Sequence, residues 1–188
     1  ITRRMAKQEG FAVCYADLDH FKEFNDRYSY FDGDRVIRLL ARLLHDVTKG
    51  LCGEHGFVGH IGGDDFIFII PTDAINETCS EIVSVFDLIA PYQYSEHDRR
   101  TGYFFGKDRR GQLHRVPLMT LSIGVVTNER RIFTAAAQVS ELATEMKGYA
   151  KTLAGSVFTV DRRMDGAAGG GDLTPPRPPR VISVIDES

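Results

Sequence analysis

A pair of glycines between two apolar runs is the feature that most constrains how this 188-residue chain can fold. Residues 57–61 and 66–70 are mostly β-branched or aromatic, and Gly62 and Gly63 lie between them. Two strand-like runs joined through glycines are typical of a β-hairpin, because glycine adopts the positive φ angles that a tight turn requires. We therefore predict a hairpin over residues 57–70 with the glycines at its tip.

Two adjacent carboxylates, Asp64 and Asp65, follow the glycine pair. Mg²⁺ prefers oxygen ligands and is commonly held by one or two carboxylates together with substrate phosphates. Glycine beside such acids allows the backbone to approach a phosphate group closely. The segment fits a metal-assisted phosphate site, but five residues alone fit a solvent-exposed turn equally well.

A second acidic segment follows the first apolar run of the chain. Residues 11–16 form a short continuous apolar run, typical of a central strand that is buried on both faces, and the acids Asp17 and Asp19 come directly after it. Ligands tend to bind beyond the ends of strands in open α/β sheets. We therefore expect Asp17 to lie near Asp64 and to share a site with it.

Periodicity along the rest of the chain predicts helices that alternate with strands. A loop at residues 32–34 is expected to precede the first long helix, and Gly50 is expected to end that helix. Residues 92–117 are polar and contain three glycines, which predicts a long loop or an exposed hairpin around residues 108–111. The expected elements are strand 11–16, helical turn 21–26, helix 36–50, hairpin 57–70, helix 75–89, strand 118–126, helix 136–150 and strand 156–160.

This order indicates an α+β fold, an α/β-type sandwich in which helices flank a mixed, mainly antiparallel central sheet. The acids are expected at one end of that sheet. The chain length fits one domain with some residues left over. We expect residues 1–163 to form the domain and the Gly- and Pro-rich residues 164–188 to form a flexible tail. We also expect a fragment truncated at its N-terminus, because the chain does not begin with methionine.

The composition argues against two classes of partner. A net charge of −3 gives no basic surface that would hold a nucleic acid, and no apolar run approaches the roughly 20 residues that span a membrane. Two of the three cysteines, Cys14 and Cys79, fall at apolar positions of a predicted strand and helix. We expect them to be reduced and buried, as in a cytoplasmic protein.

Several spaced motifs resemble those of the GGDEF diguanylate cyclases, and the similarity extends from about residue 11 to residue 160. The similar segments are Asp-Leu-Asp-His-Phe-Lys at 17–22, Asn-Asp at 25–26, Gly-Asp at 33–34, Gly-Gly-Asp-Asp-Phe at 62–66 and Ser-Ile-Gly-Val at 122–125. The resemblance implies a palm-like fold related to adenylyl cyclases and polymerases. It implies that a homodimer condenses two GTP into cyclic di-GMP, as the output domain of a bacterial signalling protein with an N-terminal sensor or receiver domain.

The resemblance also implies a role for each matching residue. Asp17, the Leu18 carbonyl, Asp64 and Asp65 would hold Mg²⁺ or Mn²⁺, and Asp64 and Asp65 would be catalytic. Two cations would polarise the α-phosphate that a ribose 3′-hydroxyl attacks, with release of pyrophosphate. The residues implied in substrate binding are Phe21, Lys22, Asn25, Asp34, Gly62, Gly63 and Lys151.

Within that set, Asn25 and Asp34 would read the edge of the guanine base. An Asp accepts hydrogen bonds from the N1 and N2 groups of guanine, whereas adenine offers no matching donors, so a buried Asp34 would be left badly paired. The resemblance therefore favours GTP over ATP as the substrate. Lys151 would contact phosphate, although a solvated lysine at a helix end also fits this position.

The chain departs from the family pattern at several positions. Asp65 stands where Glu is usual, His60 stands where Arg is usual, and residues 153–156 lack a phosphate-binding Arg. Misplacing a reacting group by about 1 Å can slow a reaction roughly 100-fold, so Asp65 is expected to weaken catalysis. Residues 53–56 replace an inhibitory Arg-x-x-Asp motif, so no product inhibition is expected there.

These departures leave an alternative function open: a catalytically inactive regulatory module that binds GTP or cyclic di-GMP. A more distant alternative is the related palm domain that makes cyclic oligoadenylates and also carries a Gly-Gly-Asp-Asp tip. The motifs at residues 19–26 and 33–34 fit the GGDEF family better than that domain.

Overall fold

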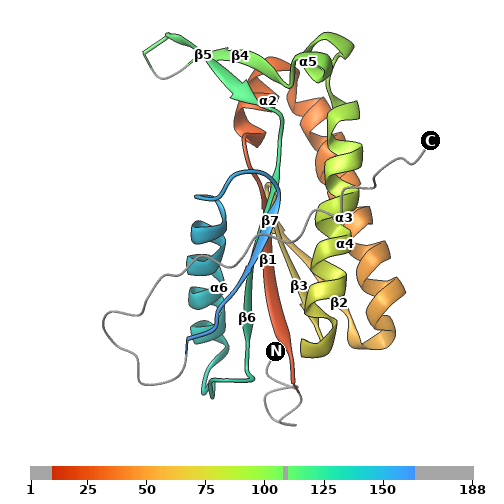
Figure 1. The fold of residues 1–188 in the computed structure, drawn as a ribbon, viewed down its shortest axis with the longest axis vertical. Helices are drawn as coiled ribbons and strands as arrows, with labels where there is room; N and C mark the ends of the chain where they lie inside the picture. Colours follow the sequence, from red (N-terminus) through yellow and green to blue (C-terminus); the bar gives the residue numbers. More distant parts are fainter. Residues whose placement is uncertain (1–9, 108–109, 164–188) are drawn as a thin grey trace, which may run out of the picture.

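A five-stranded sheet lies between two helical layers in the computed structural model, which describes residues 10–107 and 110–163 (Figure 1). The strands follow the order β2-β3-β1-β6-β7, and all neighbours are antiparallel except β6 and β7, which are parallel. This confirms the predicted mixed, mainly antiparallel sheet. The strands of this sheet are β1 (Ala12–Leu18), β2 (Phe57–Gly62), β3 (Asp65–Ile70), β6 (Leu121–Thr127) and β7 (Val157–Val160).

Helices α3 and α4 cover one face of the sheet, and α6 covers the other (Figure 1). A separate two-stranded hairpin and two short helices lie at one end of the molecule, at the top of Figure 1. In the described residues, no helix combines the length and the apolarity that crossing a bilayer requires. The helices are α2 (Phe21–Arg27), α3 (Tyr30–Cys52), α4 (Ile75–Ile89), α5 (Glu96–Thr101) and α6 (Ala136–Ala150), and the separate hairpin is β4 (Tyr103–Lys107) with β5 (Leu113–Pro117).

The side chains of β1 point alternately to the two faces of the sheet, and the apolar core therefore has two parts. Successive side chains of a strand point to opposite faces. Cys14 and Leu18 belong to the larger core with α3 and α4, whereas Phe11 and Val13 pack with residues of α6. Asp17 therefore lies on the face of the sheet that α6 covers.

Gly124 on β6 allows α6 to lie directly against the sheet. A Cβ atom at Gly124 would lie 2.6 Å from the carbonyl carbon of Met146 and 2.8 Å from the carbonyl oxygen of Ala143, and it would also overlap the backbone nitrogen of Lys147. The Thr159 hydroxyl on β7 donates a hydrogen bond to the Met146 carbonyl (3.1 Å). This part of α6 is thus held close to the ends of β1 and β6.

The segment over residues 92–117 contains the predicted exposed hairpin, β4–β5, whose tip at residues 108–109 lies outside the described residues. It also contains the short helix α5, which we did not predict. Ser95 caps α5 by accepting a hydrogen bond from the Asp98 backbone N–H (3.2 Å). The pattern Ser-x-x-Asp is a helix-start signal, so the sequence did carry evidence for this helix.

The elements differ from the sequence prediction mainly at their ends. Helix α3 begins at Tyr30, so residues 32–34 lie in its first turns and not in a loop, because Ser29 caps the helix by accepting from the Asp32 N–H (3.1 Å). The same helix continues past Gly50 to Cys52. Strand β6 begins at Leu121, later than predicted. The predicted tail lies outside the described residues.

Candidate functional site

The glycine turn between β2 and β3 has the predicted hairpin form. Gly62 pairs with Asp65, and both glycines have positive φ, 155° at Gly62 and 57° at Gly63. His60 donates from Nε2 to the Gly63 carbonyl oxygen (2.8 Å), and its ring stacks on Phe66 with centroids 4.5 Å apart. His60 thus stabilises the turn from one side.

Strand pairing brings Asp17 to this turn. Ala16 on β1 pairs with Phe66 on β3, so the adjacent residues Asp17 and Asp65 lie at the same end of the sheet. Asp17 is 6% exposed. The Lys147 ammonium donates to Asp17 Oδ2 (2.9 Å) and to Asp65 Oδ1, and thereby joins the two carboxylates.

Lys151, one helical turn beyond Lys147, also contacts Asp17. Its ammonium forms an ion pair with Asp17 Oδ1 and lies 3.9 Å from Asp19 Oδ1. The other oxygen of Asp19, Oδ2, accepts hydrogen bonds from the hydroxyls of Thr120 and Ser122, each 2.8 Å long. The predicted phosphate-binding lysine therefore lies in the acidic cluster and not in solvent away from it.

Charge and burial together shift the pKa values of Asp64 and Asp65 in opposite directions. Partial burial, followed by the nearby charge of Asp17, raises the pKa of Asp64. Burial would also raise the pKa of Asp65, but the hydrogen bond and charge of Lys147 outweigh it and lower that pKa. Burial lowers the pKa of Lys147 less than Asp65 and Asp17 raise it, so the net shift is upward. At neutral pH the pair of Lys147 and Asp65 is therefore ionised.

The donor atoms of this cluster suit a hard divalent cation. Asp17, Asp64 and Asp65 supply carboxylate oxygens, and Leu18 ends β1 next to them. Asp17 Oδ1 is buried, and its partner in the structure is the Lys151 ammonium. Within residues 10–107 and 110–163, however, no three His, Cys, Asp or Glu side chains already form a ready-made metal site. The chemistry of the residues fits a divalent cation, while the two lysines already neutralise the acids.

The predicted guanine-reading residues lie where α2 meets α3. Asn25 Oδ1 is buried and has no hydrogen-bond partner. A Cβ atom at Gly33 would overlap this oxygen and lie 2.9 Å from Asn25 Cγ, so a larger residue at position 33 would displace the Asn25 side chain. Asp34 follows Gly33 and is exposed. The structure thus places Asn25 beside the segment that carries Asp34.

Two other predicted substrate-binding residues open α2. Phe21 packs against the larger core, with its side chain partly buried. Lys22 is 82% exposed and pairs with Asp26 one helical turn away (2.7 Å). In this structure, therefore, the Lys22 ammonium is not part of the acidic cluster.

A hollow of about 430 Å³ opens beside the acidic cluster and shares Asp19 and Lys151 with it. Its size and the Lys151 ammonium in its lining fit part of a nucleotide. The other residues that line it are His20, Pro117, Thr120, Leu153, Ala154 and Gly155.

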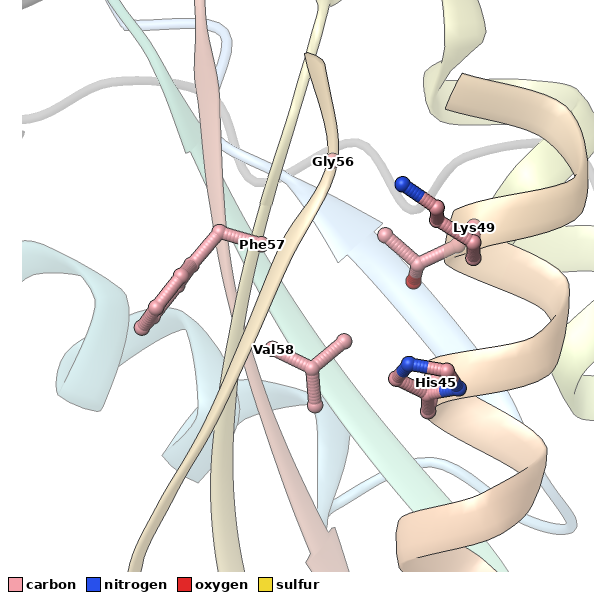
Figure 2. Close-up of a pocket in the computed structure, with 6 residues that line it drawn as sticks. His45, Lys49, Gly56, Phe57 and Val58 are labelled. Atoms are coloured by element: carbon pink, nitrogen blue, oxygen red, sulfur yellow. The ribbon is translucent and has the colours of Figure 1, made fainter. Parts of the chain in front are cut away.

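A second hollow, of about 220 Å³, lies between α3 and β2 (Figure 2). No member of the acidic cluster lines it, so it is separate from the candidate site. Its lining residues are His45, Thr48, Lys49, Gly56, Phe57 and Val58.

Lys147 is the main site residue that sequence reasoning missed. It follows Val139 and Ala143 at intervals of four, and both of these face the sheet from α6. A lysine on the buried stripe of a helix is unusual unless it is paired, so this position carried a signal. Its partner Asp17 lies 130 positions away in the chain, which no local pattern identifies.

Comparisons with known proteins agree with this geometry. A family model described as diguanylate cyclase, GGDEF domain, matches residues 1–101, more than half of the chain. The chain is 41% identical over 59 residues to an uncharacterised 19.3 kDa protein of Streptomyces ambofaciens, which is 31% of this chain and 30% of that protein. It is 37% identical over 54 residues to a diguanylate cyclase of Vibrio cholerae, 29% of this chain and 16% of that protein. The match thus spans less than a third of each relative's length.

The fold is similar to that of the GGDEF domain of DgcB from Caulobacter crescentus, solved in complex with c-di-GMP. The TM-score is 0.60 at 21% identity, over 85% of this chain and 82% of that chain. This likeness concerns the fold alone and confirms the expected palm-like architecture. The family model covers strand β1, which ends at Leu18, helices α2 to α4 and the glycine turn. The chain belongs to the GGDEF family of diguanylate cyclase domains.

Proposed function

We propose that this domain is a diguanylate cyclase that condenses two GTP into cyclic di-GMP and pyrophosphate. The meeting of Asp17 and Asp65 with Lys147 and Lys151 at the glycine turn supports this most strongly. These groups come from β1, the β2–β3 hairpin and the end of α6. Carboxylates, an ammonium group and an open glycine turn in one place match the requirements of a phosphoryl-transfer site.

GGDEF diguanylate cyclases generally use a divalent metal ion. Asp17, Asp64, Asp65 and the Leu18 carbonyl are the groups that would hold Mg²⁺ or Mn²⁺ here. When bound, the ion would polarise the α-phosphate and stabilise charge on the attacking and leaving oxygens.

The protein's own groups would position the nucleotide. The backbone at Gly62 and Gly63 has no side chains to keep a phosphate away, and the space around both positions is open. Lys151 would turn from Asp17 to the triphosphate in the adjoining hollow. These contacts would hold the α-phosphate in line with the attacking hydroxyl, which is the main task of such a site.

Asn25 and Asp34 would select guanine. The buried Asn25 Oδ1 lacks a donor in the structure, and an N–H of the base would supply one. Adenine has no N1–H or N2 amino group, so it would leave the buried Asn25 Oδ1 unpaired, whereas the exposed Asp34 would keep its water. The site should therefore discriminate strongly against ATP.

The reaction requires two nucleotides, and each domain would bind one. The 3′-hydroxyl of each GTP attacks the α-phosphorus of the other, and each P–O bond to the leaving pyrophosphate breaks. Each hydroxyl proton passes to water, so the two steps close the ring and release two pyrophosphates. Two domains would have to face each other, so we propose a homodimer as the active form. A regulatory domain joined to the N-terminal side would control this encounter.

The test is conversion of GTP in the presence of Mg²⁺ or Mn²⁺, followed by chromatography at high protein concentration. The wild-type domain should form cyclic di-GMP, and Asp64→Asn should form none. Asp73→Asn changes an exposed acid outside the site and should match the wild type.

One observation favours the alternative, an inactive nucleotide-binding module: Lys147 already engages the carboxylate of Asp65. Binding of GTP by a confirmed dimer, without any cyclic di-GMP, would refute the cyclase activity and support this alternative. Turnover of ATP in place of GTP would refute the assigned base specificity.

A further inference from the structure

Lys147 lies between two carboxylates that the proposed reaction would use to hold a cation. Its side chain is 15% exposed, and that of Asp17 is 9% exposed. The ammonium donates to Asp17 Oδ2 (2.9 Å) and to Asp65 Oδ1 at the same time. A positive charge of this protein therefore occupies the space that these two acids share.

The fold holds the Lys147 backbone at this place. Gly124 allows the backbone of α6 to touch β6 at Lys147 and Met146, and the Thr159 hydroxyl anchors the Met146 carbonyl. Val139 and Ala143 lie on the same side of α6 as Lys147 and pack into the core. Rotation of side chains can therefore separate the ammonium from the acids without displacing the helix.

The side chain of Lys151 can move away from the acids more easily than that of Lys147. Its side chain is 37% exposed and opens onto the hollow of about 430 Å³. It contacts Asp17 but is too far from Asp65 for any ion pair between them to form in the structure. Lys151 can therefore turn to a ligand in the hollow, whereas Lys147 is enclosed by its two acids.

We propose that Lys147 is a built-in counter-ion that competes with a divalent cation for Asp17 and Asp65. This inference rests on the proposed function only in assigning those acids to cation binding. A cation that uses both carboxylates must displace the ammonium from at least one of them. Two like charges cannot share this partly buried space without a strong mutual repulsion. The domain should consequently bind divalent cations more weakly than the same site without Lys147.

The test measures Mn²⁺ binding in the absence of nucleotide, from the electron paramagnetic resonance signal of free Mn²⁺. Lys147→Met keeps the length and apolar stem of the side chain but removes the charge, and it should tighten binding by about tenfold or more. Lys147→Arg retains the charge and should remain near the wild type. Lys49→Met removes one positive charge that pairs with Glu54 away from the site, and it should also remain near the wild type.

A double variant tests whether the change in Mn²⁺ affinity depends on Asp17. Asp17→Asn in the Lys147→Met background should abolish the gain, because one of the two competing acids is then neutral. Far-UV circular dichroism and urea unfolding check that each variant is folded, and Lys147→Gln replaces Lys147→Met if the latter does not fold.

Equal or weaker Mn²⁺ binding by a folded, uncharged variant would overturn the proposal. So would a tenfold gain in Lys49→Met, since the effect would then reflect net charge alone. Failure of the wild-type domain to make cyclic di-GMP would refute the proposed activity, but it would leave the binding comparison intact because no nucleotide is present in it.

Discussion

Asp98 is a single buried side chain that attaches the segment 92–117 to the domain. It is 2% exposed, and it accepts hydrogen bonds from the Tyr28 hydroxyl (2.6 Å) and from Arg27 Nε (3.3 Å). Burial alone would raise the pKa of Asp98, but the hydrogen bonds of Tyr28 and Arg27 and the charge of Arg27 outweigh burial and lower it. The folded protein therefore favours the ionised form of this acid.

We predict that Asp98→Asn destabilises the domain at pH 7 by about 1–3 kcal/mol, because Arg27 and Tyr28 lose a charged acceptor. The folded pKa lies below the unfolded value of about 3.9, so the stabilisation is full above that pH and is lost as the pH falls through the folded pKa. Urea unfolding at several pH values should show the difference from the wild type shrinking below about pH 4. A difference that persists unchanged at low pH would contradict the role of the charge, and Asp73→Asn serves as the control at an exposed acid.

At the residue scale, the sequence predicted those site residues whose arrangement depends on their immediate neighbours in the chain. Gly62, Gly63 and Asp64 lie in one short segment, so turn chemistry alone indicated their arrangement. The contact of Lys147 with Asp17 depends on how α6 packs on the sheet, which is a tertiary property. The sequence analysis therefore identified the acids but not Lys147, whose ammonium lies between Asp17 and Asp65.

Helix α6 is the element that joins the fold to the site. It packs on β6 at Gly124, where the backbone atoms of the helix leave no room for a side chain. It carries Lys147 and Lys151 one turn apart on the side that faces the acids. The position of this helix therefore determines which charges lie next to Asp17.

We predict that Gly124→Ala destabilises the domain by about 3 kcal/mol, because the added methyl group overlaps backbone atoms that can move only with the whole helix. Gly148→Ala is the matched control on α6, since nothing lies within 4 Å of a Cβ atom there. It should be neutral or stabilise the domain by roughly 0.5–1 kcal/mol through helix propensity. Urea unfolding of both variants checks the prediction, and equal stability of the two would contradict close packing at Gly124.

Periodicity predicted the long elements well because their burial pattern is regular. Helices α4 and α6 follow the expected ranges, and the hairpin over residues 57–70 is confirmed. The start of α3 depends on a cap at Ser29, a single local hydrogen bond that overrides the loop expected at residues 32–34. Helix α5 was missed because it is one and a half turns long and has no apolar stripe of its own.

At the scale of the whole molecule, the acids, the glycine turn and the larger hollow gather near one end of the sheet. The end of β1, the tip of the β2–β3 hairpin and the end of α6 meet there. One such site would bind one GTP, whereas each molecule of the cyclic product contains two nucleotides. The arrangement therefore calls for a second copy of the domain.

We predict that the rate of cyclic di-GMP formation per domain rises with protein concentration, because only dimers bring two nucleotides together. Initial rates over a wide concentration range, compared with the dimer fraction from sedimentation velocity, check this. A constant rate per domain in samples that remain monomeric would contradict the homodimer. Fusion to a coiled coil that dimerises the domain should remove the concentration dependence.

The pairing of the acids with Lys147 and Lys151 has a consequence for the protein inside a cell. Carboxylates crowded at the end of a sheet would repel one another in a newly made chain, but here two lysines of the same chain already offset that repulsion. We therefore expect the domain to fold without a metal ion. A shortage of divalent cations would reduce the output of the domain while its abundance stays constant, so signalling could resume without new protein synthesis once the ions return.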